Sequence, residues 1–541
     1  MKLSVLPRPI LDCIESGGFV AELVFLLYKT AESLSEPTVK LFLYQETCLD
    51  EYSIENEICY HLKNHPVEES HVQQLAANYI MYYKILLNLP AIILGLFCGA
   101  WSDRVGRKLP MILPCLGSIF AVLIYMLGML PTWKTLPFIF IGATVNGMFG
   151  KSAVIAMAVH SYATDTSTND QRTRRLGKLL SMNFFGLFFG SLLAGCLLDV
   201  LSFNAIFCIV VGINGLATLV ILIFLKESVP GIEDDRERDK SKGSGTFLFN
   251  PNNIRESLMV LFCPRENNGR CHLMLLFLTV ITNQICKAGE VDITMLFVER
   301  APLGWSKSLY GYLLAVDFAC LGLSLWILLP LFSNILGIKD ANLVLIGLTF
   351  KISRLIFVAF SNQTWMVFAS VVVGSVSGMI VSGCKSLISK TVTEAEVGKS
   401  FSLLSCGETA SNLVGAIIFT NIYSATFEIF PGFTFIVEAF IFIALLVMFV
   451  WLARDIKASE RYRLLESVSG QTSYGTEMNP NTQEPHGDST DIPESVQKDN
   501  LTVEKFEFPP DLEHDDPVAE KGRATRMSTL SEEEDSSLKQ E

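Results

Sequence analysis

The sequence predicts an all-α polytopic membrane protein with twelve transmembrane helices in two six-helix bundles, followed by a disordered cytosolic tail. Three observations lead to this fold class. Half of the 541 residues are apolar and the mean hydropathy is +0.40, which is unusual for a soluble globular protein. The apolar residues gather in twelve runs, each long enough to cross a hydrocarbon layer of about 30 Å. A long polar segment then separates the first six runs from the last six.

The twelve predicted spans are 8–28, 77–98, 109–130, 136–160, 176–200, 203–225, 271–298, 309–332, 341–360, 365–388, 400–423 and 431–453. We therefore expect an N-terminal bundle over 1–226, which includes a non-cytosolic loop at about 29–76. A cytosolic linker follows over 227–270, and a second bundle covers 271–456. The tail, 457–541, has few aromatic residues and many Pro, Ser and Glu residues, a composition typical of disorder.

The distribution of charge predicts the orientation. Residues 466–541 contain 19 acidic and 6 basic residues, so they account for the whole net charge of −13. Elsewhere, basic residues gather after the second, fourth, tenth and twelfth spans, and the opposite loops nearly lack them. Cytosolic loops carry this excess of Lys and Arg. Both termini are therefore expected in the cytosol.

The cysteines predict one disulfide. Of 13 cysteines, only Cys48 and Cys59 lie in a substantial non-cytosolic loop, where an oxidising compartment permits a bond between them. The spacings of metal-binding Cys and His motifs are absent, and so is the glycine-rich phosphate loop of ATP-driven pumps. We expect no enzymatic activity, no metal, no cofactor and no nucleic-acid partner.

The most informative motif is the polar turn between the second and third spans, Gly99-Ala-Trp-Ser-Asp103-Arg-Val-Gly106-Arg107-Lys108. A membrane-spanning helix does not tolerate three cations and an aspartate so close together, so this is a tight turn at the membrane surface. The pattern resembles the signature loop between helices 2 and 3 of the major facilitator superfamily. That resemblance implies a latch of Gly99, Asp103, Gly106 and Arg107 that closes the inward face.

Three further stretches resemble the proton-coupled folate transporter family, solute carrier family 46. They are Tyr-Ala-Thr-Asp at 162–165 with Arg-Thr-Arg-Arg at 172–175, then Gly-Glu-Val-Asp-Ile at 289–293 with Pro-Leu-Gly-Trp at 302–305, and the segment 388–402. The resemblance covers about residues 75–455. It implies transport by alternating access between two bundles, with helices 1, 4, 7 and 10 lining the path.

The sequence departs from this family at the positions that matter for substrate. The folate-transporting member has a glutamate early in helix 5, where this chain has Ser181-Met182-Asn183. Its acidic position in helix 4, its helix-7 histidine and its helix-10 arginine correspond to Lys151, Lys287 and Lys385. The resemblance therefore does not extend to folate transport by the same proton mechanism.

Charged residues within the spans are costly unless they face a partner or an aqueous path. Asn283, Lys287, Glu290 and Thr294 share one helical face. Lys287 and Glu290 either neutralise each other at i, i+3 or exchange partners with substrate and proton. Lys351, Arg354 and Glu438 also fall within predicted spans, without an evident role.

For each of four further charged residues, the sequence allows two interpretations. Asp317 and Glu408 are either proton carriers or structural ion-pair partners, because a carboxyl in an apolar site has a raised pKa. Lys151 either binds substrate or pairs with a carboxylate of helix 1. Lys385 either lines the path or flanks a cytosolic helix end.

The tail begins with overlapping sorting patterns. Glu460, Leu464 and Leu465 form an acidic dileucine pattern, and Tyr462 begins a Tyr-x-x-apolar pattern. They resemble signals read by clathrin adaptors at endosomes and lysosomes. We therefore favour the lysosomal or endosomal membrane, with the plasma membrane as the alternative.

Together these observations predict a proton-coupled secondary transporter in the lipid bilayer. It moves a small organic solute, anionic because three path-side positions are lysines, towards the cytosol. Family precedent indicates folate-like compounds, muropeptides or cyclic dinucleotides. The alternative is a non-transporting receptor or scaffold that signals through the acidic tail; retention of the latch residues argues against it.

Overall fold

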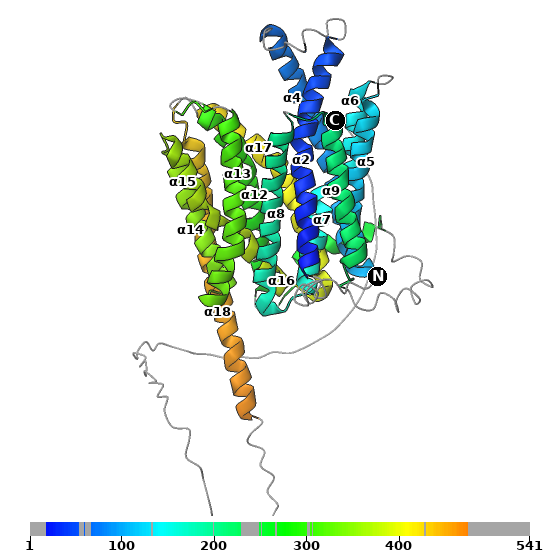
Figure 1. Cartoon of the computed structure of the whole chain (residues 1–541). Helices are drawn as coiled ribbons and strands as arrows, with labels where there is room; N and C mark the ends of the chain where they lie inside the picture. Colours follow the sequence, from blue (N-terminus) through cyan, green and yellow to red (C-terminus); the bar gives the residue numbers. More distant parts are fainter. Residues whose placement is uncertain are drawn as a thin grey trace, which may run out of the picture. The chain divides into compact units, whose positions relative to one another are not determined.

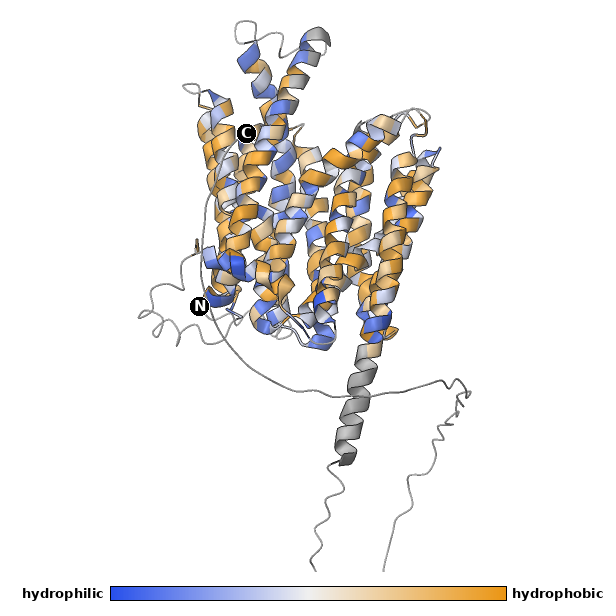
Figure 2. Ribbon diagram, turned by 180° about the vertical axis from the view of Figure 1, so that it is seen from behind, coloured by the Kyte–Doolittle hydropathy of each residue, from blue (hydrophilic) through white to orange (hydrophobic). Residues whose placement is uncertain are grey.

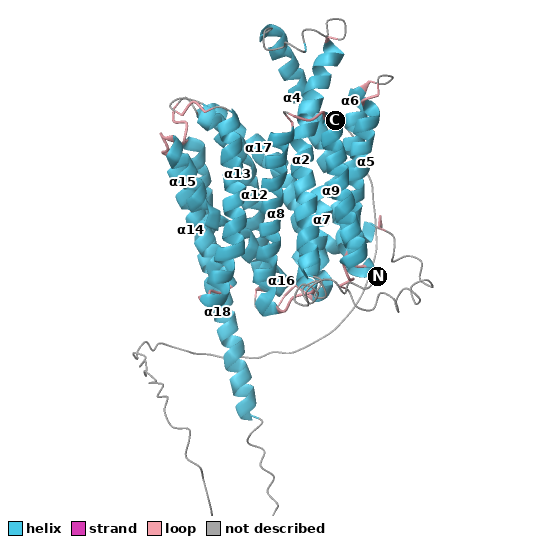
Figure 3. Cartoon of the chain, viewed as in Figure 1, coloured by secondary structure: helices cyan, strands magenta, loops and turns pink. Residues whose placement is uncertain are grey.

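The computed structural model consists of helices and their connections over the residues that it describes (Figure 3). These residues are 18–52, 59, 66–130, 134–198, 200–228, 248–249, 251–265, 268–299, 303–305, 307–426 and 429–473. No strand occurs among them. The expectations for residues 1–17 and for the tail from 474 onward lie outside this described part of the chain.

The first half contains α2 (Gly18–Glu51), α4 (Pro66–Val105), α5 (Lys108–Gly128), α6 (Thr135–Met148), α7 (Lys151–Asp165), α8 (Asn169–Leu197) and α9 (Phe203–Phe224). A short helix, α11 (Pro251–Phe262), follows. The second half contains α12 (Gly269–Glu299), α13 (Lys307–Leu323), η2 (Ser324–Leu328), η3 (Leu331–Ile335), α14 (Asp340–Ala359), α15 (Thr364–Gly374), η4 (Ser375–Ser377), α16 (Gly378–Thr391), η5 (Glu394–Glu396), α17 (Val397–Thr426) and α18 (Phe433–Ser473).

Within the described residues, eleven helical segments are long and apolar enough to cross a membrane, and the first begins at Asn78. They agree with the last eleven predicted spans. Apolar residues follow the lengths of the helices and hydrophilic residues gather towards their ends (Figure 2). The predicted all-α, membrane-spanning fold class is confirmed.

The first span requires a correction. We predicted a helix over 8–28 and a loop at about 29–76, but α2 continues to Glu51 and α4 begins at Pro66. The charges of this segment do not interrupt the helix because they pair along it: Lys29 with Glu32 at 2.8 Å and Lys40 with Glu36 at 2.7 Å. With 34 residues, α2 is about 51 Å long, and it extends beyond its neighbours together with α4 (Figure 1).

Three of the spans are not continuous α-helices, and one of them, 309–332, passes from α13 into the π-helical segments η2 and η3. The predicted span 136–160 consists of α6 and α7, which are separated at Phe149 and Gly150. Gly150 has a φ of 85°, and Lys151 has a φ of 41°, a conformation that few side chains adopt. The predicted span 365–388 consists of α15 and α16 with the short 3₁₀ segment η4 between them.

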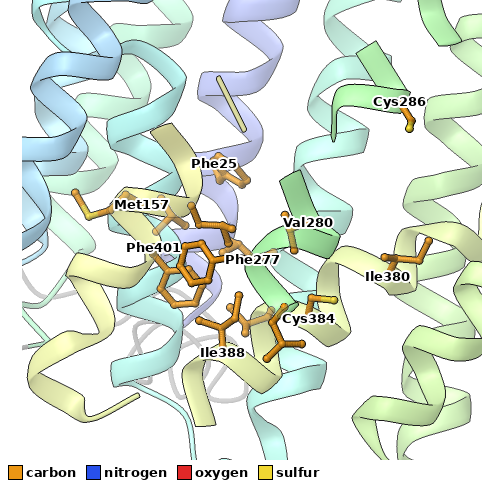
Figure 4. Close-up of a cluster of buried hydrophobic side chains, with 14 of the residues drawn as sticks. Phe25, Met157, Phe277, Val280, Cys286, Ile380, Cys384, Ile388 and Phe401 are labelled. Carbon is orange, nitrogen blue, oxygen red and sulfur yellow. The ribbon is translucent and has the colours of Figure 1, made fainter. Parts of the chain in front are cut away.

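The two halves meet along a defined set of helices. Across them, α4 and α7 contact α17, while α8 contacts α13 and α16. The main apolar core includes Phe25, Met157, Phe277 and Phe401, from α2, α7, α12 and α17, so it draws on both halves (Figure 4). The short helix α11, which the sequence did not predict, contacts α4 and α17. The predicted linker over 227–270 therefore contains a packed helix.

Candidate functional site

The predicted latch centres on Arg107, whose side chain is 2% exposed between α4 and α5. Its guanidinium lies 2.7 Å from Asp103 Oδ1 and 2.9 Å from Asp165 Oδ2, and it donates to Ser102 Oγ at 2.6 Å. Burial alone would lower the pKa of Arg107, but the charges of Asp103 and Asp165 offset this effect and raise it. Arg107 therefore stays charged and holds Asp103 in place.

Asp103 connects the two halves. The backbone N–H of Gly398, in the first turn of α17, donates to Asp103 Oδ1 at 3.1 Å. A negative charge is favoured at this position because the N-terminus of a helix carries partial positive charge. A Cβ on Gly398 would overlap Asp103 and Arg107. We call the end of the helices at which residues 103–108 lie the loop side.

The two glycines of the motif allow close approach. Gly106 has a φ of 102°, which favours glycine. The turn is held by Glu227, whose carboxylate accepts from the backbone N–H groups of Arg107 at 2.7 Å and Lys108 at 3.2 Å. A Cβ on Gly99 would lie 2.6 Å from Ser402 Cβ. Small residues at such contacts let two membrane helices pack closely.

The helix α11 adds a second connection at the loop side. The Glu256 carboxylate lies 2.6 Å from Arg104 Nη2 of α4 and 3.1 Å from Lys399 Nζ of α17. Burial alone would raise the pKa of Glu256, but hydrogen bonds and charges from Lys399 and Arg104 lower it. Glu256 is therefore ionised at neutral pH and bridges a helix from each half.

A second buried polar contact joins the two halves. Lys385 of α16 is 3% exposed, and its ammonium lies 3.0 Å from Glu408 of α17 and 3.4 Å from His160 Nε2 of α7. His160 packs against the rings of Phe25 and Phe401. Lys385 is thus a buried residue, not the flanking lysine of a helix end, and Glu408 is ion-paired.

Lys151 begins α7 directly after the interruption of the helix. Its ammonium lies 3.5 Å from Glu32 Oε1, while Lys29 contacts Glu32 at 2.8 Å and also Ser152. The expected pairing with a carboxylate of the first helix is therefore present. The partner comes from the segment that we predicted as a loop.

Among the described residues, Lys287 and Glu290 do not form an ion pair, so the first of the two readings, mutual neutralisation, does not describe this structure. Glu290 instead pairs with Lys351 and lies 3.0 Å from Arg354 Nε, both on α14. Two cations from a neighbouring helix therefore surround the carboxylate. Arg354 also donates to Asp317 Oδ1 at 2.8 Å, so Asp317 is ion-paired. This cluster explains the charges of α14, which the sequence left without a role.

Lys287 lies at the junction of the halves. Its ammonium is 4.5 Å from the centre of the Phe184 ring of α8, a favourable contact between a cation and an aromatic face. Lys151, Lys287 and Lys385 thus belong to three different helices. Their nearest contacts also differ: Glu32 for Lys151, Phe184 for Lys287, and Glu408 with His160 for Lys385.

The remaining predicted residues lie outside this region. Cys48 is disulfide-bonded to Cys59, the pair that the sequence predicted. Glu460, Tyr462, Leu464 and Leu465 fall within the last part of α18. Over the described part of the chain, no group of three His, Cys, Asp or Glu side chains is placed to hold a metal ion.

Sequence reasoning missed several members of these contacts. Asp165 ends the Tyr-Ala-Thr-Asp motif, so a role in the latch could have been considered. Ser102 lies inside the polar turn itself. His160, Glu227 and Glu256 gave no local signal, since their partners come from helices distant in the sequence.

Comparisons with known proteins identify the family of the chain. Residues 71–352 match the Major Facilitator Superfamily. The lysosomal proton-coupled steroid conjugate and bile acid symporter SLC46A3 of Gallus gallus is 25% identical over 444 residues, 80% of this chain and 93% of that protein. The proton-coupled folate transporter of Rattus norvegicus is 25% identical over 379 residues, 68% of this chain and 77% of that protein.

The fold is also similar to that of solved transporters. The human organic anion transporter MFSD10 has a TM-score of 0.60 at 14% identity and covers 82% of this chain and 100% of its own. The fucose:proton symporter FucP of E. coli has a TM-score of 0.53 at 14% identity, over 80% of this chain and 97% of its own. The chain belongs to the Major Facilitator Superfamily, in the branch of solute carrier family 46.

Proposed function

We propose that the protein is a proton-coupled secondary transporter that moves an organic anion towards the cytosol by alternating access. The observation that carries this proposal is the buried contact of Lys385 with Glu408 and His160. It joins the two halves and combines a cation, a carboxylate and an imidazole. An anionic group of a solute could replace Glu408 on Lys385, and the released carboxylate could then bind a proton.

Two further cations support an anionic solute. Lys287 has no carboxylate within ion-pair distance among the described residues, since its ammonium lies over Phe184. Lys151 lies at the start of α7, where the interrupted helix leaves backbone N–H groups without helical partners. Transporters use such interrupted helices to bind anionic groups of their substrates. Lys151, Lys287 and Lys385 are therefore the proposed solute-binding residues.

For the proton we propose Asp317 and Glu408 as candidates. Each is held by a cation, Asp317 by Arg354 and Glu408 by Lys385. A carboxylate that loses its cation in a desolvated site takes up a proton, because the charged form is no longer stabilised. Exchange of ion-pair partners during the cycle would couple solute and proton movement.

The contacts at the loop side support a state that is closed there. Asp103 with Gly398, and Glu256 with Arg104 and Lys399, connect the halves at that end. We place the loop side in the cytosol because its connections carry the basic residues. In this orientation the described state receives solute from the opposite side, and separation of the latch releases it to the cytosol.

The relatives define which solutes to test first. Their names record steroid conjugates, bile acids and folates as solutes, with protons as the coupling ion. We propose the lysosomal or endosomal membrane as the location. One relative is lysosomal, and the patterns at Glu460–Leu465 fit clathrin adaptors.

Uptake by purified protein in liposomes tests the proposal. We expect a radiolabelled steroid sulfate, bile acid or folate to accumulate when the outside is acidic, and the accumulation to stop when a protonophore collapses the gradient. Lys385→Gln should abolish uptake, whereas Lys457→Gln, which alters an exposed cation at the very end of the last span, should not. Uptake that is unchanged after collapse of the gradient would exclude proton coupling.

A receptor or scaffold would depend on its tail instead. Deletion of residues 466–541 should leave uptake intact if the protein is a transporter. Absence of flux for every solute in this set, together with loss of the cellular phenotype on deletion of the tail, would favour the scaffold.

A further inference from the structure

The carboxylate of Glu438 on α18 is buried and has no hydrogen-bond partner among the residues that the structure describes. The residue is 0% exposed, and neither Oε1 nor Oε2 accepts a hydrogen bond from any described residue. One turn further along α18, the Phe442 ring lies 5.6 Å from Lys351 Nζ. This face of α18 is therefore directed at the charge cluster of the second half.

The cations around Glu438 are already engaged. The charges that act on it are Glu290 of α12 and Lys351 and Arg354 of α14. Lys351 pairs with Glu290, and Arg354 is shared between Glu290 and Asp317 of α13. The two cations that act on Glu438 are thus already paired with two other carboxylates, those of Glu290 and Asp317.

Three other titratable groups lie near the cluster, on α12 and α13. The Cys286 thiol of α12 and the Tyr310 hydroxyl of α13 are neutral in their ordinary forms. Tyr310 donates to the backbone carbonyl of Val291 at 2.6 Å. The ammonium of Lys287 lies over Phe184, on the side of α12 that faces α8; its charge acts on Asp317 and Glu290 but is not among the charges that act on Glu438.

An ionised carboxylate in this position would be unfavourable. Removal of a carboxylate from water without a partner costs several kcal/mol, and such groups become neutral instead. A carboxyl group that competes with a second one for the same cation titrates together with it. The neutral acid is therefore the form of Glu438 that fits this state.

We propose that Glu438 is a proton-binding site whose ionisation is controlled by the ion pair of Lys351 with Glu290. While Lys351 stays on Glu290, an Oε atom of Glu438 holds a proton. When solute binding or helix movement releases Lys351, Glu438 gives this proton to water and pairs with the cation. The role in transport rests on the proposed function and adds a third carboxyl to Asp317 and Glu408.

Infrared difference spectroscopy of the purified full-length protein tests the proton directly, without any solute. Wild type minus Glu438→Gln should show the C=O stretch of a protonated carboxylic acid at neutral pH. Gln has the shape of the protonated acid, so this variant should fold normally. Asp170→Asn, which removes an exposed carboxylate in the first turn of α8, is the matched control and should leave the band in place.

A second variant tests control by the ion pair. Glu290→Gln frees Lys351 and removes one of the two carboxylate contacts of Arg354, so the band of Glu438 should disappear although Glu438 is still present. Absence of the band from the first difference spectrum would overturn the proposal. Persistence of the band in folded Glu290→Gln would also overturn it, since Glu438 would then be protonated independently of the pair.

Transport by the same variants separates this inference from the proposed function. A pH difference of one unit drives about tenfold accumulation when one proton accompanies each solute. With a radiolabelled steroid sulfate as the probe, Glu438→Gln should lose this accumulation but keep solute exchange. If uptake by wild type does not respond to the gradient, the proposal of proton-coupled transport is refuted. The infrared result then still decides whether Glu438 holds a proton. If wild type responds and Glu438→Gln responds equally, its role in coupling is refuted.

Discussion

Asp103→Asn should increase the fraction of molecules in which the two halves are separated at the loop side. The substitution keeps the shape of the side chain and an oxygen that can accept from the Gly398 N–H, but it removes the charge. A charge-assisted hydrogen bond contributes about 1.5–3 kcal/mol, roughly twice as much as a neutral one. The closed state should therefore lose about 1 kcal/mol, which is about a fivefold shift towards the open state.

Native cysteines can measure this shift. Cys406 of α17 is 3% exposed, and its thiol donates to the backbone carbonyl of Ile92 of α4 at 3.4 Å. Its reaction with a maleimide therefore requires α4 and α17 to separate. The labelling rate follows the open population when opening and closing are fast, so we expect about fivefold faster labelling of Cys406. The exposed Cys271 provides the reference within the same molecule.

The matched control is Asp170→Asn, which alters an exposed aspartate in the first turn of α8. It should leave the labelling of Cys406 unchanged. A more severe variant, Arg107→Ala, leaves Asp103 and Asp165 without their shared cation, a loss of about 3 kcal/mol or more. Both latch variants should reduce transport at normal protein abundance. Equal labelling of Cys406 in folded wild type and Asp103→Asn would refute the latch.

Three further predictions address other parts of the molecule. Gly99→Ala should slow transport because a Cβ meets Ser402 across the halves, whereas Gly215→Ala, with no atom within 4 Å, should not; equal uptake by both variants would contradict this. Glu256→Gln should weaken the connection through α11 and speed labelling of Cys406. The effect should be smaller at high salt, because partly exposed ion pairs are screened. An effect of the same size at high salt would contradict this role of the Glu256 ion pairs. Replacement of Leu464 and Leu465 by Ala should move the protein from lysosomes to the plasma membrane, as seen by immunofluorescence, and unchanged surface staining would exclude the dileucine pattern as the signal.

The sequence predicted what depends on local composition. Eleven spans follow from apolar runs, and the turn around Asp103 and Arg107 stands out because polar residues interrupt two such runs. The continuation of α2 to Glu51 was missed for the opposite reason. Its charges resemble a loop in composition, but they pair at i, i+3 and i, i+4 and so remain compatible with a helix.

Partners from distant helices could not be predicted. The i, i+3 spacing suggested Lys287 as the ion-pair partner of Glu290, but the partner is Lys351, 61 residues away. The helix α11 has six apolar residues among its twelve but lies within a polar segment, and the sequence does not show that it contacts α4 and α17. In each case the decisive information is which helices are neighbours, and hydrophobic periodicity does not contain it.

The bond from Gly398 to Asp103 has a consequence for the stability of α17 itself. The first N–H groups of a helix have no partner within the helix and require a cap. Here one of them is capped by a carboxylate from the opposite half of the molecule. Whenever the halves separate, the first turn of α17 loses this cap, and its amide becomes open to exchange with solvent deuterium. The rate of hydrogen exchange at the Gly398 amide should thus report how often the two halves separate, without any label or solute.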